Sequence, residues 1–125
     1  MSGNEKILIA DDEETVRSLV KRLLGKTYKV IEADNGEEAV KVAVNQKPDL
    51  ILMDILMPQM DGLTACYAIK RNQATKEIPV IMLTAVDYDL NRKLSQDVMG
   101  AQGYITKPFN SEALMNMIAK FLSAD

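Results

Sequence analysis

The chain has 125 residues, 47% of them hydrophobic and 26% charged, and its formal net charge is −3 at pH 7; this is the make-up of one ordinary globular domain, and it disfavours disorder. The chain has no histidine and one cysteine, which excludes histidine-based triads, most zinc sites and an internal disulfide, and its scattered basic residues give no electrostatic footprint for nucleic acid. With no signal-like start and no apolar run long enough for a bilayer, we expect a cytoplasmic protein without membrane insertion.

Strand-like and helical patterns alternate along the chain. In chain order they are a strand at Lys6–Ala10, a helix across Val16–Leu23, a strand at Tyr28–Glu32, a helix between Asn35 and Lys47, a strand at Leu50–Met53, a helix after Asp61, a strand at Val80–Leu83, a helix across Asp87–Met99, a strand at Gly103–Ile105 and a helix across Leu114–Leu122. The first, third and fourth strands are apolar without alternation, as strands buried on both faces are, and the other two fit sheet edges. Asn35, Asp61 and either Asn110 or Ser111 are expected to cap helices.

Five βα units in succession predict an α/β fold: a five-stranded parallel sheet with helices on both faces, joined by right-handed crossovers. We expect a single doubly wound (βα)5 domain with the flavodoxin-like strand order 2-1-3-4-5. The sequence has no internal repeat and no linker. We therefore expect one domain over residues 1–125, with a core of about residues 6–122 and no output domain.

Chemically active side chains follow four of the five strands. They are Asp11 and Asp12 after the first strand, Asp54 after the third, Thr84 at the end of the fourth and Lys107 after the fifth. In an open α/β sheet, ligands bind beyond the carboxyl ends of the strands, so these groups are expected to converge.

Each of these residues also has a purely structural interpretation. Asp11 could form a capping box with Glu14, Asp54 could form a turn, and Lys107 could be a solvated side chain. Together the structural interpretations are weaker, because like charges a few ångströms apart repel by about 1–4 kcal/mol per pair. The cluster therefore indicates a bound cation.

Ligands that are all oxygen, with no histidine, favour Mg²⁺ over zinc or copper. A lysine and a hydroxyl beside a metal-bound carboxylate suit a phosphoryl group. The chain has no P-loop of the form GxxxxGK[ST], so nucleotide binding is not expected. The attacking group would then be a carboxylate, which gives an aspartyl phosphate.

Four motifs in order resemble the receiver domain of bacterial response regulators, the chemotaxis regulator type in particular: ILIADDEE, PDLILMDILMPQMDG, IPVIMLTA and GYITKPF. The resemblance extends from Lys6 to Leu122. It implies that Asp54 is the phosphoacceptor. It also implies that Mg²⁺ is held by Asp12 directly, by Asp11 largely through water, by Asp54, and by the backbone carbonyl of Leu56.

The same resemblance implies roles for three further side chains. Thr84 is the expected switch hydroxyl, Lys107 the cation that pairs with the phosphoryl group, and Tyr104 the aromatic rotamer switch, although ordinary strand packing also explains Tyr104. The peptide bond before Pro108 is expected to be cis.

The function implied by the resemblance is a phosphorylation-dependent signalling switch. A sensor histidine kinase or a phosphotransfer protein would donate the phosphoryl group. A target protein would bind the face formed by the fourth helix, the fifth strand and the fifth helix. The protein would catalyse only its own phosphorylation and dephosphorylation, so we do not class it as an enzyme.

Three other functions remain open from the residues alone. A flavodoxin-like flavin carrier shares the winding, but it needs a hydroxyl- and glycine-rich loop where this chain has acids. A small Mg²⁺-dependent phosphohydrolase needs a general acid two residues after the nucleophile, where Leu56 stands. A receiver that signals without phosphate commonly loses the acceptor or the acid pair. We interpret Cys66 as core, Met57 and Met60 as loop packing, and Glu13 and Glu14 as solvated first-turn acids.

Overall fold

The computed structural model describes residues 5–85 and 100–122. Its elements in chain order are β1 (Lys6–Ala10), α1 (Glu14–Leu24), β2 (Lys29–Ala33), α2 (Gly36–Gln46), β3 (Leu50–Met53), α3 (Gly62–Lys70), β4 (Val80–Thr84), β5 (Gly103–Thr106) and α5 (Ser111–Leu122). The helix predicted at Asp87–Met99 lies outside the described residues. Within the described ranges, no helix is both long and apolar enough to cross a membrane.

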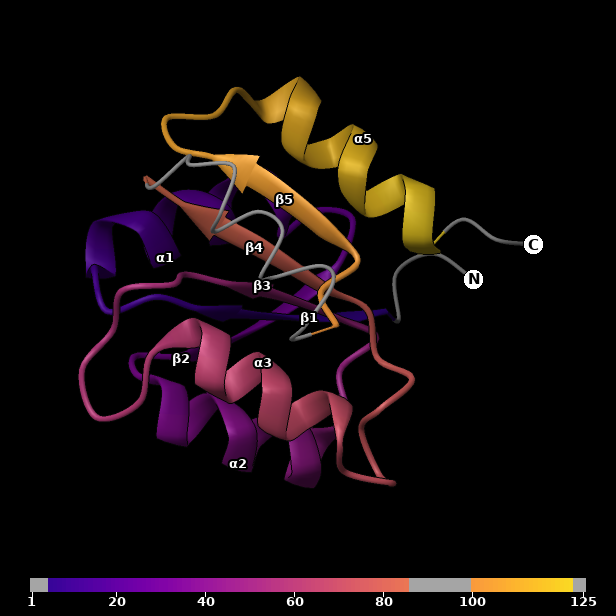
Figure 1. Cartoon of the computed structure of the whole chain (residues 1–125). Coiled ribbons are helices and arrows are strands. Elements are labelled where there is room, and N and C mark those ends of the chain that lie inside the picture. Colours follow the sequence, from indigo (N-terminus) through magenta and orange to yellow (C-terminus); the bar gives the residue numbers. More distant parts are fainter. Residues whose placement is uncertain (1–4, 86–99, 123–125) are drawn as a thin grey trace.

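The five strands form one parallel sheet in the order β2-β1-β3-β4-β5 (Figure 1). This confirms the predicted α/β class and strand order. It also confirms that β2 and β5, the two strands with the fewest apolar residues, lie at the edges. The winding reverses between β1 and β3, so the carboxyl ends of these two neighbouring strands flank the crevice in which a ligand is expected.

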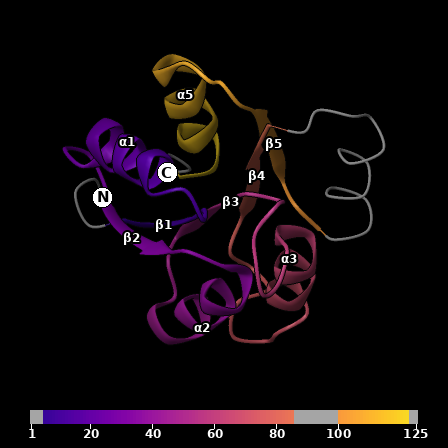
Figure 2. The same cartoon turned by 90° about the vertical axis from the view of Figure 1, so that its left-hand side faces the viewer.

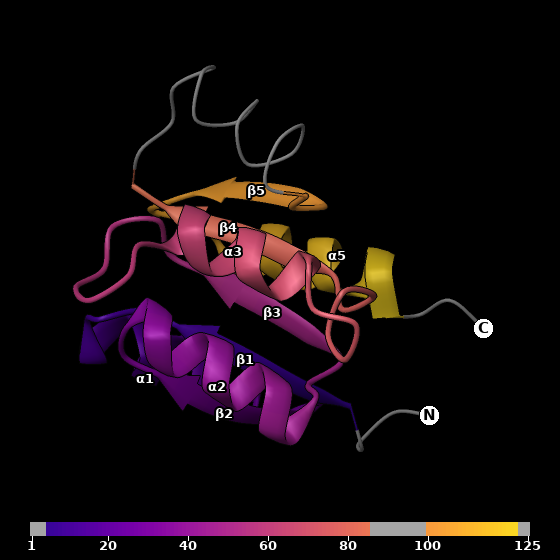
Figure 3. The same cartoon turned by 60° about the horizontal axis from the view of Figure 1, so that its bottom comes forward.

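Helices cover both faces of the sheet. Figure 2 shows α1 and α5 on one face and α2 and α3 on the other, and Figure 3 shows α2 and α3 side by side across their face. Alternation along β1 divides its side chains between two cores, with Ile7 and Ile9 facing α1 and α5, and Leu8 and Ala10 facing α2 and α3. Both faces of the strand are therefore apolar, which explains why its sequence does not alternate.

The strand bounds differ slightly from those predicted. The second strand is Lys29–Ala33 rather than Tyr28–Glu32, because the backbone N–H of Tyr28 still bonds to the carbonyl of Leu24 in the turn after α1 (2.8 Å). β4 and β5 each extend one residue beyond their predicted ends, to Thr84 and Thr106, which pair with each other.

The predicted caps of three helices are confirmed. Asn35 accepts a hydrogen bond from Glu38 N (2.8 Å), Asp61 from Thr64 N (2.7 Å) and Asn110 from Ala113 N (2.7 Å). Such caps satisfy backbone donors that a helix start leaves without a partner.

The alternative structural interpretation of Asp11, a capping box with Glu14, is wrong. α1 begins at Glu14, its N-cap is Glu13, and Glu13 makes no side-chain cap bond. The Asp11 carboxylate instead accepts from Glu13 N at 2.9 Å, two residues on, inside the loop that precedes the helix.

Candidate functional site

Asp54 follows the last residue of β3 and is buried. Its backbone N–H bonds to the Ala10 carbonyl on β1 (2.9 Å). The loop beyond it folds back, because Gly62 N donates to Ile55 O at 2.7 Å. Gly62 comes so close that a Cβ there would overlap the Asp54 carbonyl oxygen. The backbone on both sides of Asp54 therefore has little room to move.

Asp11 stands at the end of β1 and is 0% exposed. Its backbone N–H donates to Ala33 O on β2 (3.0 Å), and its carbonyl accepts from Arg17 Nη1 (2.8 Å). Its carboxylate accepts from Glu13 N through Oδ1 and from Lys107 Nζ through Oδ2. A buried carboxylate needs such partners, because an unpaired charge inside a protein is strongly unfavourable.

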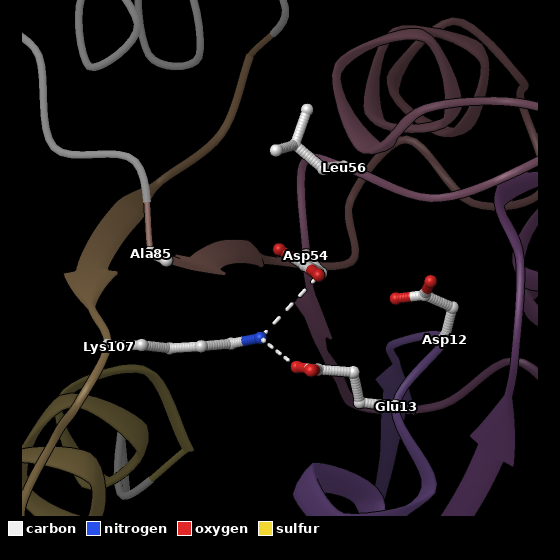
Figure 4. A pocket seen from close by; sticks show the side chains of 6 residues that line it. All are labelled: Asp12, Glu13, Asp54, Leu56, Ala85 and Lys107. Atoms are coloured by element: carbon white, nitrogen blue, oxygen red, sulfur yellow. Dashed lines mark ion pairs between the residues drawn. The ribbon is translucent and has the colours of Figure 1, made fainter.

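Lys107 follows β5 and reaches across the site. Its Nζ atom lies 2.7 Å from Asp11 Oδ2, 3.5 Å from Asp54 Oδ2 and 3.6 Å from Glu13 Oε1. Figure 4 shows the extended lysine pointing at the carboxylates of Asp54 and Glu13. The peptide bond between Lys107 and Pro108 is cis, as predicted.

The pKa of Lys107 is raised above its ordinary value. Burial by itself lowers the pKa, but the hydrogen bond to Asp11 and the negative charges of Asp54, Asp11 and Glu13 together outweigh burial. The ammonium is therefore charged at neutral pH and faces this group of acids.

Asp11, Asp12 and Asp54 each offer a carboxylate oxygen, and these oxygens all lie within 4.8 Å of one another. The predicted convergence of the three acids is confirmed. A pocket of about 270 Å³ opens beside them, lined by Asp12, Glu13, Asp54, Leu56, Ala85 and Lys107. An all-oxygen donor set at the mouth of an open pocket fits Mg²⁺, which keeps several waters when it binds.

The remaining predicted site residues are Thr84, Tyr104 and Leu56, and each lies within three residues of a residue that lines the pocket or lines it itself. Thr84 is the last residue of β4, and its backbone pairs with Thr106, which precedes Lys107. Tyr104 is buried on β5, paired with Met82 and packed in the core that faces α2 and α3. Leu56 lines the pocket and is 63% exposed, and its side chain points away from the acids in Figure 4.

Two residues of this site were missed from the sequence. Its position in the sequence predicts that Glu13 is a solvated first-turn acid, yet it lines the pocket and faces Lys107. No sequence motif marks Arg17, yet its Nη1 donates to the Asp11 carbonyl (2.8 Å) and its Nε donates to Glu32 Oε1 on β2 (2.9 Å). Arg17 lies six residues after Asp11, near the start of α1, where an arginine is as readily solvated, so the contact is visible only in the structure.

Glu32 receives a second cation, Lys21, at 3.0 Å. The hydrogen bonds from Lys21 and Arg17 lower the pKa of the Glu32 carboxyl, with Lys21 making the larger contribution. Burial opposes them but is outweighed. Arg17 therefore has an ionised partner at neutral pH.

The family model for the response regulator receiver domain matches residues 7–119. The chain is 41% identical over 108 residues to the alkaline phosphatase synthesis transcriptional regulatory protein PhoP of Bacillus subtilis (strain 168), covering 86% of this chain and 44% of that protein. It is 39% identical over 118 residues to Protein PilG of Pseudomonas aeruginosa, covering 94% of this chain and 87% of that protein. The chain thus spans less than half the length of PhoP but most of PilG.

Two solved structures show the same fold. The chemotaxis protein CheY4 of Vibrio cholerae superposes with a TM-score of 0.88 at 31% identity, covering 96% of this chain and 100% of that one. The receiver domain of a sensor histidine kinase from Pseudomonas aeruginosa PAO1 superposes with a TM-score of 0.87 at 27% identity, covering 98% and 100%. That second structure has a magnesium ion coordinated in its active site cleft.

Proposed function

Because the chain belongs to the response regulator receiver domain family, a signalling module and not an enzyme in its own right, we propose that it is switched by phosphorylation of Asp54. The donor is the phosphohistidine of a sensor histidine kinase or of a phosphotransfer protein. One observation carries the proposal: Lys107 Nζ lies 3.5 Å from Asp54 Oδ2, and the oxygens of Asp11 and Asp12 lie within 4.8 Å of the same carboxylate. Family membership displaces the flavin carrier and the phosphohydrolase as alternatives.

In the transfer step, a carboxylate oxygen of Asp54 attacks the phosphorus in line with the donor nitrogen. The O–P bond forms as the N–P bond breaks, and the imidazole leaves with the electron pair. Lys107 balances the charge on the phosphoryl oxygens, since its raised pKa keeps it protonated. Asp54 is buried but lines the pocket, and the donor reaches its carboxylate from there.

Mg²⁺, when bound, neutralises the charge that accumulates on the phosphoryl oxygens. We assign Asp12, Asp54 and the Leu56 backbone carbonyl to hold it directly. Asp11 already accepts hydrogen bonds on both carboxylate oxygens, which favours a role through bound water. The magnesium ion in the active site cleft of the related receiver domain supports the choice of metal.

The signal leaves the site through Thr84 and Tyr104 in this proposal. A phosphoryl group adds about −1.5 to −2 charges and three acceptor oxygens beside Lys107. The Thr84 hydroxyl binds one of these oxygens, and Tyr104, two positions away along the neighbouring strand, repacks in response. The face formed by the fourth helix, β5 and α5 then favours a target protein. The fourth helix itself lies outside the described residues.

Intact-mass measurement tests the acceptor. The protein is incubated with Mg²⁺ and acetyl phosphate, alongside Asp54→Asn and the control Asp34→Asn, an exposed acid outside the cluster. The wild type and Asp34→Asn should gain one phosphoryl adduct, and Asp54→Asn should gain none. Full retention of the adduct in Asp54→Asn would overturn the assignment.

A further inference from the structure

Glu13 occupies the mouth of the pocket opposite Lys107. It is the N-cap residue of α1 but makes no side-chain cap bond. Its backbone N–H is fixed by Asp11 Oδ1 at 2.9 Å. Its side chain is 61% exposed, and Oε1 lies 3.6 Å from Lys107 Nζ (Figure 4). The backbone of Glu13 is therefore anchored to the acid cluster, while its side chain is exposed to solvent beside the pocket.

The three carboxylates around Lys107 differ in burial and in their distance from the ammonium. One ammonium lies within 4.0 Å of three carboxylates, those of Asp11, Glu13 and Asp54. Asp11 makes the shortest contact and is completely buried, so its position changes little. Glu13 is the exposed member of the three. A phosphoryl group on Asp54 needs the same ammonium and brings additional negative charge into the pocket that Glu13 lines.

We propose that Glu13 is a positioning residue that sets the balance between the two ligands of this site, a divalent cation and a phosphoryl group. This inference rests on the proposed function. In the resting site, the Glu13 carboxylate shares the Lys107 ammonium with Asp11 and Asp54 and adds to the negative potential that attracts Mg²⁺. When a phosphoryl group is present, the same carboxylate competes with it for Lys107 and repels it. Removing the charge should therefore weaken binding of the cation and strengthen binding of the phosphoryl group.

The two expected changes in affinity are opposite in direction, and this distinguishes a positioning role of Glu13 from a merely structural one. A substitution that merely loosens the loop after β1 would weaken both ligands, because both depend on Asp11 and Asp12 in that loop. Glu13 is exposed, so solvent screens its charge, and each affinity should change by about two- to fivefold. The changes should shrink as ionic strength rises, because salt screens exposed charges.

The test uses Glu13→Gln, which keeps the size of the side chain and removes its charge. Glu14→Gln is the matched control, because Glu14 is also an exposed acid at the start of α1 but does not line the pocket. Two dissociation constants are measured by calorimetry or by amide chemical shifts. The first is that of Mg²⁺ alone, and the second is that of beryllofluoride, a phosphoryl mimic, at saturating Mg²⁺.

Glu13→Gln should bind Mg²⁺ about two- to fivefold more weakly and beryllofluoride about two- to fivefold more tightly at low salt. Glu14→Gln should match the wild type in both. The inference is overturned if both constants of Glu13→Gln move in the same direction, if neither moves, or if Glu14→Gln behaves in the same way. A failure of the proposed function looks different, because the wild type would then bind no beryllofluoride and gain no phosphoryl adduct.

Discussion

Three carboxylates held close together should destabilise the metal-free protein, and this can be measured by neutralising one of them. Asp12→Asn is the suitable change, because Asp12 is exposed whereas Asp11 and Asp54 are buried among other groups. The amide of Asn has nearly the same shape as the carboxylate. The substitution therefore removes the charge and leaves the packing in place, and we expect a gain in the free energy of unfolding without Mg²⁺.

The size of the gain follows from the geometry. At 4.8 Å, the upper limit of the oxygen–oxygen distances, two like charges repel by about 0.9 kcal/mol in water and about 3.5 kcal/mol at an effective dielectric constant of about 20. Asp12 is exposed, so the lower figure is the better guide, and Lys107 offsets part of the repulsion. Summed over its two neighbours, the net gain should be about 1 kcal/mol, which raises the Tm of a domain of this size by about 3–6 °C.

Magnesium should reverse the order of stability. A ligand that binds only the folded state stabilises it by RT ln(1 + [L]/Kd), or about 1.4 kcal/mol at ten times Kd. The wild type should gain this amount, and Asp12→Asn should gain much less, because it lacks a carboxylate that we assign to hold the ion directly. Urea unfolding followed by circular dichroism, in EDTA and in Mg²⁺ at matched ionic strength, measures both effects.

The control is Glu14→Gln, which removes an acid from the same end of α1 but not from the cluster. It should not raise stability in EDTA and should leave the response to Mg²⁺ unchanged. Two results would refute the reasoning. One is an Asp12→Asn variant less stable than the wild type in EDTA, and the other is an equal gain from Mg²⁺ in both proteins.

Three further predictions concern the groups around this site and the core. Arg17→Met should weaken Mg²⁺ binding about threefold to tenfold in a calorimetric titration, because it removes the hydrogen bond to the Asp11 carbonyl. The control Lys21→Met should leave Mg²⁺ binding unchanged. Equal losses of affinity in the two variants would contradict this role of Arg17. Burial raises the pKa of the Cys66 thiol to about 12, so only about one thiol in ten thousand is ionised at pH 8. Iodoacetamide should therefore label the folded protein at least about 100-fold more slowly than the urea-unfolded protein. Comparable labelling rates would disprove the burial of Cys66. Lys107→Met should lower the free energy of unfolding at pH 7. Because the pKa of Lys107 is raised in the folded protein, the ammonium contributes fully to the free energy of unfolding below pH 10.5, and this contribution is lost as the pH rises through the raised pKa. The free energies of unfolding of the two proteins, measured by urea titration, should therefore converge at high pH. A difference that stays constant with pH would argue against the ion pairs.

Most of the fold could be predicted from the sequence because its signals are local. An apolar run such as Leu50–Met53 has few structures open to it other than a strand buried on both faces, and the structure confirms it with all four residues buried. Strand ends are less local. β2 ends at Ala33 because Ala33 pairs with Ala10 on β1, and an alanine carries little strand preference of its own.

The candidate site was predicted in part for the same reason. The acids at the ends of β1 and β3 are recognisable because the sheet topology brings strand ends together. The contact between Glu13 and Lys107 joins residues 94 positions apart and depends on where one exposed side chain lies. No pattern in the sequence distinguishes such an acid from a solvated residue in the first turn of a helix, so this part needed the structure.

The rigidity of the backbone explains how a cluster of like charges persists at this end of the sheet. Asp54 is held by the bond from its N–H to Ala10, and Asp11 by the bond from its N–H to Ala33. Gly62 lies against the backbone carbonyl of Asp54, and any larger residue at position 62 would displace Asp54. Since these contacts involve the backbone, they are independent of the charge on the carboxylates, and the repulsion cannot relax by moving the strands apart. A cation or a phosphoryl group bound with Mg²⁺ relieves that repulsion on arrival, and the relief adds to the free energy of binding.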